Sequence, residues 1–191
     1  MSDPSLPRVL LPLFLDVTGR AVLVVGAGTI ASRKALDLVA AGANVHVVAP
    51  AISAELTEAA SDALTLEQRP FEERDLDGAW LVFAATDDAA VQRRVAGACE
   101  RARVFCVAVD DPPNASAYGG AVVRRGPVTI AISTSGEAPA VARLLREILE
   151  QLLPDEGYLE AARALRERWR SEKTPMGSRF AELVAAFKAR A

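Results

Sequence analysis

The sequence predicts an α/β fold, a doubly wound parallel sheet followed by a hairpin and a helical C-terminal region. Short apolar runs alternate with helical patterns as far as Asp110. A glycine-rich turn, Gly26-Ala27-Gly28, joins the first apolar run to the first helical pattern. Beyond the turn-rich stretch 111–114 this alternation stops, and helical periodicity dominates from Glu137 onward. Regular alternation of strand and helix patterns is typical of a doubly wound sheet.

The apolar runs of the first part are predicted to be strands, at residues 21–25, 44–49, 64–66, 80–85 and 104–109. Helices are predicted from the glycine turn to about Ala41 and over 88–101. The strand runs are nearly continuous rather than alternating, as strands covered on both faces of a parallel sheet require. The first two strands and the helix between them therefore form a βαβ unit.

A hairpin is predicted next, because the runs 121–124 and 128–132 flank Arg125-Gly126-Pro127. The following helix carries apolar residues at spacings of three and four, at Val141, Leu144, Leu145, Ile148 and Leu152. Two further helices are predicted at about 156–170 and 177–188, on either side of Thr174-Pro175. Their apolar stripes are narrow for a free-standing domain, which favours burial against a partner, most simply in a homodimer.

These patterns predict three parts. Residues 1–112 form the doubly wound α/β domain, residues 113–145 form a hairpin and dimerisation or cleft segment, and residues 146–191 form a helical C-terminal region.

Composition restricts the classes of function. The chain has 191 residues, of which 51% are hydrophobic and 25% are charged, and its net charge is −3. This balance supplies a core but no global basic field, so neither nucleic acid nor an anionic membrane is expected as a partner. Cys99 and Cys106 lack metal-ligand spacing and are expected to be reduced core residues, with no metal site. Without a persuasive signal peptide or a long apolar run, the protein is expected to be cytoplasmic.

The strongest local motif is Gly26-x-Gly28-x-x-Ala31, directly after a strand and at the start of a helix. Gly26 permits the tight turn, Gly28 lets the backbone approach a pyrophosphate, and the small Ala31 allows the helix to pack closely on the strand. The helix N-terminus faces the anion. A Rossmann-like dinucleotide site is therefore favoured over a glycine turn that binds nothing.

One part of the dinucleotide fingerprint is missing. A carboxylate usually holds the adenine ribose about 20 residues after the glycines, but 45–50 contains none. Backbone at Pro50 and Ala51 is expected to replace it. The absence of an arginine there favours NAD over NADP. His46 lies between valines in a predicted strand and is interpreted as a packed or edge residue rather than a catalytic one.

Polar residues follow the fourth and fifth predicted strands. Because ligands bind at the carboxyl ends of strands in open α/β sheets, Thr86 is a candidate cofactor contact. Asp87 or Asp88 is expected to cap the next helix. Asp110 ends the fifth strand at the same edge as the glycines, and it is either a general base or a turn residue before two prolines.

The loop Ser133-Thr134-Ser135 offers hydroxyls and backbone amides ahead of a helix, a seat for a carboxylate or phosphate. Thr134-x-x-Glu137 matches a capping box. Pro139 argues against that box and favours a later helix start, which leaves the hydroxyls free for other contacts. Arg124 and Arg125 are candidate partners of an acidic ligand, although exposed turn arginines are commoner.

Together these residues resemble the precorrin-2 dehydrogenase family, the dehydrogenase/ferrochelatase part of siroheme synthases. The matching segments are 11–15 (LPLFL), 24–34 (VVGAGTIASRK), 84–88 (AATDD), 109–110 (VD), 124–135 (RRGPVTIAISTS), Pro139 and 142–147 (ARLLRE). One departure is the pair Gly119-Gly120, where the family usually has bulky apolar residues and a proline.

The resemblance implies NAD-dependent oxidation of precorrin-2 to sirohydrochlorin in siroheme or cobalamin synthesis. It implies that NAD lies over Gly26, Gly28, Thr29 and Ile30 and near Pro50 and Ala51. The family's catalytic aspartate corresponds to Asp110, and its serine loop in the tetrapyrrole cleft corresponds to 133–135. Similar proteins are homodimers through their helical C-terminal parts.

Two alternatives stay open. Some relatives also insert a metal ion into sirohydrochlorin, whereas others carry out only the oxidation. A different class of function is a regulatory dimer that senses NAD without chemistry. A sensor needs the glycine turn but neither Asp110 nor the Ser-Thr-Ser loop, and the presence of both favours the enzyme.

Overall fold

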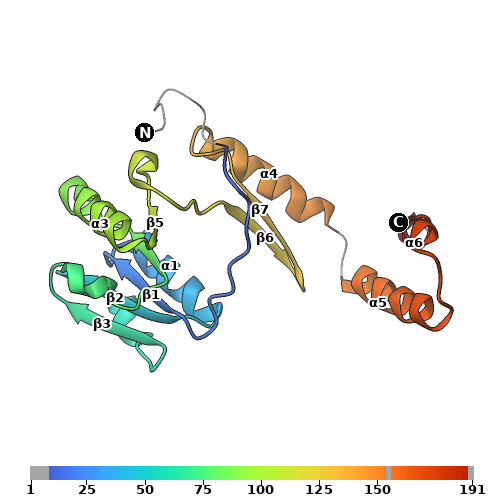
Figure 1. Ribbon diagram of the computed structural model, residues 1–191, viewed down its shortest axis with the longest axis horizontal. Helices are drawn as coiled ribbons and strands as arrows, with labels where there is room; N and C mark the ends of the chain where they lie inside the picture. Colours follow the sequence, from blue (N-terminus) through green and yellow to red (C-terminus); the bar gives the residue numbers. More distant parts are fainter. Residues whose placement is uncertain (1–8, 154–155, 189–191) are drawn as a thin grey trace. The chain divides into compact units, whose positions relative to one another are not determined.

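The computed structural model describes residues 9–153 and 156–188 (Figure 1). The chain divides into two compact units. The first extends to Gly119 and includes Ser135–Glu137, and the second comprises Gly120–Thr134 and the chain from Ala138 onward.

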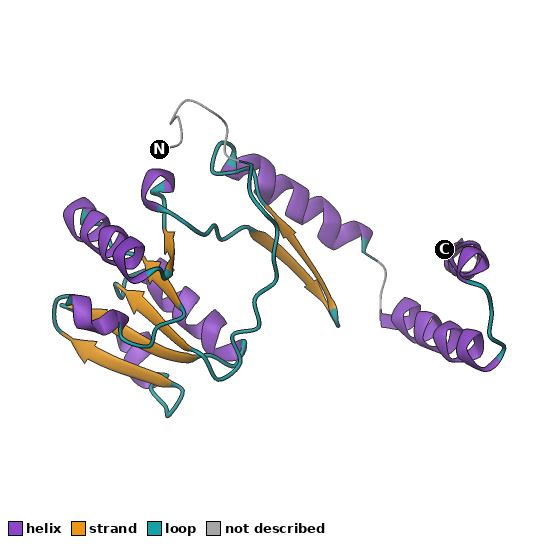
Figure 2. Cartoon of the chain, in the orientation of Figure 1, coloured by secondary structure: helices purple, strands orange, loops and turns teal. Residues whose placement is uncertain are grey.

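The first unit is built on strands that alternate with helices, as the sequence predicts (Figure 2). The strands are β1 (Ala21–Val25), β2 (Asn44–Ala49), β3 (Leu64–Gln68), β4 (Leu81–Ala84) and β5 (Phe105–Ala108). The helices are α1 (Thr29–Ala40), α2 (Ala54–Glu58) and α3 (Ala89–Ala102), with 3₁₀ turns η1 (Glu73–Leu76) and η2 (Pro112–Asn114).

The five strands form one parallel sheet in the order β3-β2-β1-β4-β5, which confirms the doubly wound prediction. The strand order reverses between β1 and β4, so their carboxyl ends define the crevice where such sheets bind ligands. The register pairs Val25 with Ala84, which brings the residues that follow these two strands together.

Apolar side chains fill both faces of the sheet. In β1, Val22 and Val24 pack in one core cluster with α1 and α2, whereas Leu23 and Val25 pack in a second cluster with α3. Successive strand residues point to opposite faces. Because both faces are covered by helices, nearly every position is apolar, which explains the continuous strand runs in the sequence.

The helix α2 was not expected from the sequence. It has only five residues, too few for a periodic pattern, and its start is set by Ser53, whose side chain accepts a hydrogen bond from the Leu56 amide at 3.3 Å. Leu56 is fully buried against the sheet, so tertiary packing supports a helix that is too short to be stable alone.

The second unit contains the predicted hairpin and the C-terminal helices (Figures 1 and 2). Its elements are β6 (Ala121–Arg125), β7 (Val128–Ile132), α4 (Pro139–Leu152), α5 (Glu156–Ser171) and α6 (Met176–Lys188). A Cβ on Gly120 would lie 2.4 Å from the Ile132 carbonyl oxygen. Of the two glycines that depart from the family pattern, Gly120 therefore has no room for a side chain, whereas a Cβ on Gly119 would meet only Val107 Cγ1, at 3.9 Å.

The start of α4 decides between the two interpretations of the preceding loop. Pro139 is the first helical residue and Ala138 is the N-cap. The capping box between Thr134 and Glu137 is not formed, because the helix begins after both residues. Proline fits the first helical position, where its missing N–H is not needed.

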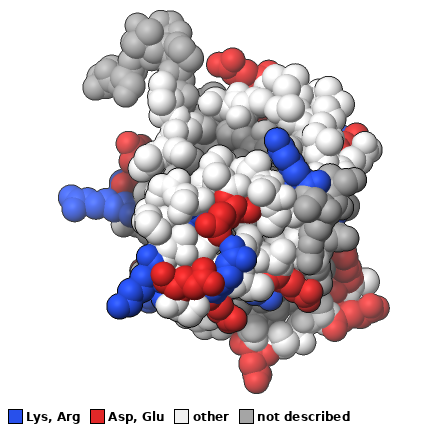
Figure 3. Space-filling model, turned by 90° about the vertical axis from the view of Figure 1, so that its right-hand side faces the viewer, with Lys and Arg blue, Asp and Glu red and all other residues white. Residues whose placement is uncertain are grey.

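Within the described parts of the chain, no helix is both long enough and apolar enough to cross a membrane. Acidic and basic side chains are interspersed with uncharged ones on the face shown in Figure 3. This surface agrees with the small net charge of −3.

Candidate functional site

A cavity of about 970 Å³ lies at the carboxyl edge of the parallel sheet, around the point where the strand order reverses. Four segments that follow β1, β2, β4 and β5 line it. It brings together eight of the residues singled out from the sequence, which are Gly26, Gly28, Thr29, Ile30, Pro50, Ala51, Thr86 and Asp110. The glycine turn and Asp110 therefore lie at the same edge of the sheet.

The two glycines of the turn meet different surroundings. Gly26 has φ +116°, and a Cβ placed there would lie 2.2 Å from the Ala85 carbonyl oxygen. Its N–H donates to the Val48 carbonyl at 2.9 Å. Gly28 has extended backbone, and a Cβ placed there would meet nothing within 4 Å. Gly26 thus allows the chain after β1 to approach the chain after β4 closely, whereas Gly28 leaves the cavity open beside the backbone.

The helix α1 begins at Thr29 with no side-chain cap, so its first amides are left for another acceptor. Thr29 and Ile30 line the cavity at this helix start. An N-terminus of this kind attracts anions through its N–H groups and the helix dipole.

Two hydroxyls connect the glycine turn to the segment after β2. Ser32, fully buried on α1, lies 3.1 Å from Ser53 Oγ and also donates to the Ala27 carbonyl at 3.4 Å. This pair holds the loop that contains Pro50 and Ala51 against the glycine turn. Neither serine is predicted from the sequence, because the two residues lie 21 positions apart and meet only in the folded chain.

The turn after β4 separates a capping aspartate from a cavity-lining one. Asp88 accepts hydrogen bonds from the Ala90 amide at 2.8 Å and the Val91 amide at 3.2 Å, so the predicted capping role is confirmed for this residue. Thr86 Oγ1 accepts from the Asp88 amide at 3.3 Å. Thr86 and Asp87 line the cavity.

Asp110 follows β5 in a left-handed conformation, with φ +55°, and its side chain is exposed. Such a φ is uncommon for a residue other than glycine. The preceding Val109 N–H donates to the Ala84 carbonyl at 2.9 Å, and its carbonyl accepts from Gln92 Nε2 at 2.7 Å. The backbone on the N-terminal side of Asp110 is therefore held from two elements.

Hydrogen bonds between Asp111 and Asn114 hold the turn that follows Asp110. Asn114 Nδ2 donates to Asp111 Oδ2 at 2.6 Å, and the Asn114 amide donates to the Asp111 carbonyl at 3.1 Å. Asp111 is thus held in the turn by Asn114, and both Asp110 and Asp111 line the cavity, where Asp110 is the exposed one.

Three predicted substrate contacts, Arg124, Ser133 and Thr134, belong to the second unit. Arg124 is exposed on β6. The Thr134 hydroxyl accepts a hydrogen bond from the Ala138 amide at 3.2 Å, so the expectation that the loop hydroxyls are all free of helix contacts is wrong for this residue. The reason is that the amide just before α4 lacks a backbone acceptor.

The fourth predicted contact, Ser135, is grouped with the first unit and has φ +56°. The adjacent Gly136 has φ +85°, and its Cβ would lie 3.0 Å from Pro112 Cγ. This close approach places the end of the serine loop beside the turn that follows Asp110.

Arg125 has a structural role. Its guanidinium donates to the Leu153 carbonyl at 2.8 Å and the Glu150 carbonyl at 2.7 Å, at the C-terminal end of α4. These carbonyls have no partner within the helix, so the arginine supplies their hydrogen bonds. Its positive charge also interacts favourably with the negative end of the helix dipole.

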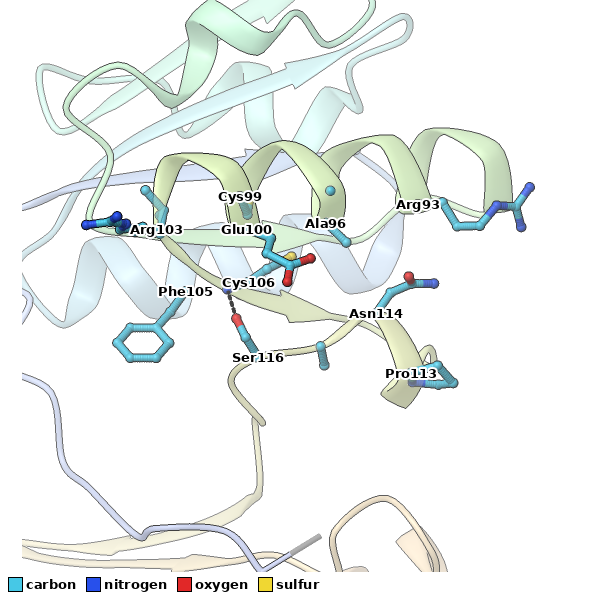
Figure 4. Close-up of a pocket in the computed structure, with 13 residues that line it drawn as sticks. Arg93, Ala96, Cys99, Glu100, Arg103, Phe105, Cys106, Pro113, Asn114 and Ser116 are labelled. Atoms are coloured by element: carbon cyan, nitrogen blue, oxygen red, sulfur yellow. Dashed lines mark hydrogen bonds between the residues drawn. The ribbon is translucent and has the colours of Figure 1, made fainter. Parts of the chain in front are cut away.

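A second, smaller pocket of about 470 Å³ lies between α3 and β5 (Figure 4). Cys99 and Cys106 line it, and both are free and buried, as the sequence predicts. A hydrogen bond with Cys106, together with burial, raises the pKa of the Cys99 thiol. The dashed line in Figure 4 marks the Cys106 amide donating to Ser116 Oγ at 2.8 Å, which covers this edge of the sheet.

His46 lies in the middle of β2 with its Nε2 3.1 Å from Glu67 Oε1 on β3. It is not part of the cavity lining, and the interpretation as a packed strand residue is confirmed. In the part of the chain that the structure describes, no three His, Cys, Asp or Glu side chains gather as a metal site would require.

Comparison with known proteins identifies the family of this chain. Residues 13–121 match the family described as "Putative NAD(P)-binding", and residues 125–152 match the family described as "Sirohaem biosynthesis protein central". The chain belongs to the siroheme synthase N-terminal family, which includes precorrin-2 dehydrogenases. Its first unit is accordingly an NAD(P)-binding domain.

Relatives in this family include the siroheme synthases of Citrobacter koseri, 43% identical over 172 residues, and Salmonella typhimurium, 42% identical over 172 residues. Each match covers 88% of this chain, but the chain spans only 38% of the length of either relative. A solved structure named "SirC, precorrin-2 dehydrogenase" is 26% identical with a TM-score of 0.72, and the match covers 92% of this chain and 88% of that one.

Proposed function

We propose that this protein catalyses the NAD-dependent dehydrogenation of precorrin-2 to sirohydrochlorin, in siroheme or cobalamin synthesis. The observation that carries the proposal is the shared cavity, in which the glycine turn and the exposed Asp110 carboxylate lie at one edge of the sheet. The similarity to a precorrin-2 dehydrogenase over 92% of the chain supports the choice of substrate.

The residues of the cavity fit a dinucleotide. The open space beside Gly28 and the uncapped start of α1 suit a pyrophosphate, and a Cβ at Gly28 would occupy that space. Pro50 and Ala51 would contact the adenosine side, and Thr29, Ile30 and Thr86 would complete the site. When bound, NAD supplies the acceptor for a hydride.

The chain's own residues position the substrate and take up the proton. Dehydrogenation removes one hydride and one proton from the macrocycle, and the Asp110 carboxylate accepts the proton. The acidic side chains of the tetrapyrrole bind to Arg124 and to the hydroxyls and amides of Ser133, Thr134 and Ser135. The main contribution to the rate is the orientation of two bound molecules.

The working form is a homodimer in the cytoplasm, assembled through the helical C-terminal part. The apolar stripe of α4 supports this assembly, because its large side chains are 41–71% exposed in the single chain, at Val141, Leu144, Leu145, Ile148 and Leu152. Burying such a stripe against a second copy removes it from water.

Incubation with precorrin-2 and NAD tests the proposal. We expect NADH absorbance and the sirohydrochlorin chromophore to rise together in a one-to-one ratio. NAD binding without either change would instead support the regulatory sensor. A parallel incubation with ferrous or cobaltous ion and sirohydrochlorin measures metal insertion separately, so that its result does not affect the test of oxidation.

A further inference from the structure

Gln92 on α3 is a buried polar side chain with no role in the reaction described above. It is only 4% exposed. Its Nε2 donates to the Val109 carbonyl at 2.7 Å, across 17 residues of sequence. Burying an amide is costly unless its groups are hydrogen-bonded, so this contact strongly favours one arrangement of α3 and the end of β5.

The hydrogen bond acts on the residue before Asp110. The Val109 N–H is held by the Ala84 carbonyl of β4 at 2.9 Å, and the Val109 carbonyl is held by Gln92. Both polar groups of Val109 are therefore fixed before the chain turns into the left-handed conformation of Asp110, at φ +55°. A non-glycine residue keeps such a conformation only where its surroundings hold it.

Gln92 is itself firmly placed. Asp88 caps α3 through the Ala90 and Val91 amides, and the Gln92 amide donates to the Asp88 carbonyl at 2.9 Å. Gln92 also lines the same cavity as Thr86 and Asp110. A continuous set of contacts therefore runs from the turn after β4, through the first turn of α3, to the backbone beside Asp110.

We propose that Gln92 is a positioning residue, which sets the direction of the Asp110 carboxylate in the cavity through its hydrogen bond to Val109. The inference rests on the proposed dehydrogenase function and deepens it, because Asp110 is effective only when its carboxylate meets the substrate at the right distance and angle. Gln92 does not touch the reacting atoms.

Gln92→Met tests this role, because methionine keeps the size and flexibility of the side chain but cannot donate a hydrogen bond. We expect kcat to fall about tenfold or more, while KM for precorrin-2 and Kd for NAD stay within about twofold. Gln68→Met makes the same change at an exposed position of β3 and should leave kcat unchanged. Wild-type kcat in Gln92→Met would overturn the proposal.

A double mutant separates positioning from packing. If Gln92 acts through Asp110, adding Gln92→Met to Asp110→Asn should reduce the remaining single-turnover rate less than twofold, since the carboxylate to be oriented is already absent. A further tenfold loss would show a packing effect and would overturn the proposal. If the Met variant does not fold, Gln92→Asn makes the same test, because it keeps the amide but shortens its reach.

Amide hydrogen exchange gives a readout that needs no turnover. In Gln92→Met we expect exchange at residues 109–111 to accelerate about tenfold or more, with exchange in α1 and β2 unchanged. Unchanged exchange at 109–111 would overturn the positioning role even if the enzyme assay fails. If wild-type protein binds NAD but does not oxidise precorrin-2, the proposed function fails. Accelerated exchange at 109–111 in Gln92→Met would still show that Gln92 fixes the backbone of this turn.

Discussion

Gly26 and Gly28 stand two residues apart in one turn, but glycine is required at each for a different reason. At Gly26 the backbone has φ +116° and the Ala85 carbonyl occupies the place of a Cβ. At Gly28 the backbone is extended and the Cβ direction is open. The first glycine therefore serves the fold, whereas the second is proposed to make room for the ligand.

Alanine at each position should separate these two roles. Gly26→Ala is expected to lower the free energy of unfolding by about 3 kcal/mol, through overpacking and backbone strain. Gly28→Ala should keep wild-type stability and raise Kd for NAD about tenfold or more, since its methyl group enters the cavity. Denaturant unfolding and calorimetric titration with NAD measure the two effects. Equal loss of stability in both variants would contradict this separation.

Asp110 is exposed, so replacing it should not disturb folding. Asp110→Asn keeps the shape and polarity of the side chain, and asparagine tolerates a positive φ, but the amide cannot accept the proton. We expect wild-type thermal stability and NAD affinity, with kcat reduced about a hundredfold or more. NADH formation in single-turnover experiments measures the loss, and turnover like that of wild type would remove Asp110 from the mechanism.

At the scale of elements, an ion pair holds η1 beside the end of β3. Arg69 donates to both Asp75 carboxylate oxygens, at 2.9 and 2.6 Å, and the Glu72 amide donates to the same carboxylate at 2.8 Å. The Asp75 side chain is 2% exposed. Burial acts to raise the pKa of Asp75, but the hydrogen bonds from Arg69 and Glu72 lower it below its ordinary value.

This pair should make stability depend on pH. Because the pKa of Asp75 is lower in the folded protein, its contribution is present above the unfolded value of about 3.9 and is lost as pH falls through the folded value. Asp75→Asn should therefore be less stable than wild type at pH 7, with the difference shrinking below about pH 4. Urea unfolding at several pH values measures it, and a constant difference would contradict the assignment.

In the second unit, Arg125 links the hairpin to the far end of α4. Its two hydrogen bonds to the Glu150 and Leu153 carbonyls need the forked guanidinium, which lysine cannot reproduce. Arg125→Lys is expected to lower the free energy of unfolding by about 1 to 2 kcal/mol. Arg124→Lys, at the exposed neighbouring position, is the matched control and should change stability by less than about 0.5 kcal/mol in the same denaturation experiment.

For the whole molecule, the apolar stripe of α4 predicts the state of assembly. Leu144 is 55% exposed in the single chain, and a charge at this position could not be buried against a second copy without a large cost. Leu144→Glu should therefore convert the proposed dimer to a monomer while the helix content stays unchanged. Arg143→Gln on the same helix is the control. Light scattering after size-exclusion chromatography measures the mass, and a wild-type monomer would refute the dimer.

Much of this architecture was predictable because local patterns carry it. The run AVLVV became β1 at the predicted bounds, since continuous apolar residues suit a strand covered on both faces. Pro139 correctly predicted a late start of α4. By contrast, Gln92 carries no local signal, because its partner Val109 follows β5, 17 residues further along the chain, and is reached only once α3 packs on the sheet.

The amino-acid order alone determined the alternation of strands and helices, the glycine turn and the position of Asp110 after a strand, because each depends on neighbours a few residues apart. Only the folded chain decided that Gly26 abuts Ala85, that Ser32 pairs with Ser53 and that Gln92 holds Val109. Those contacts join residues distant in sequence, and their distances depend on how helices pack against the twisted sheet rather than on any local preference.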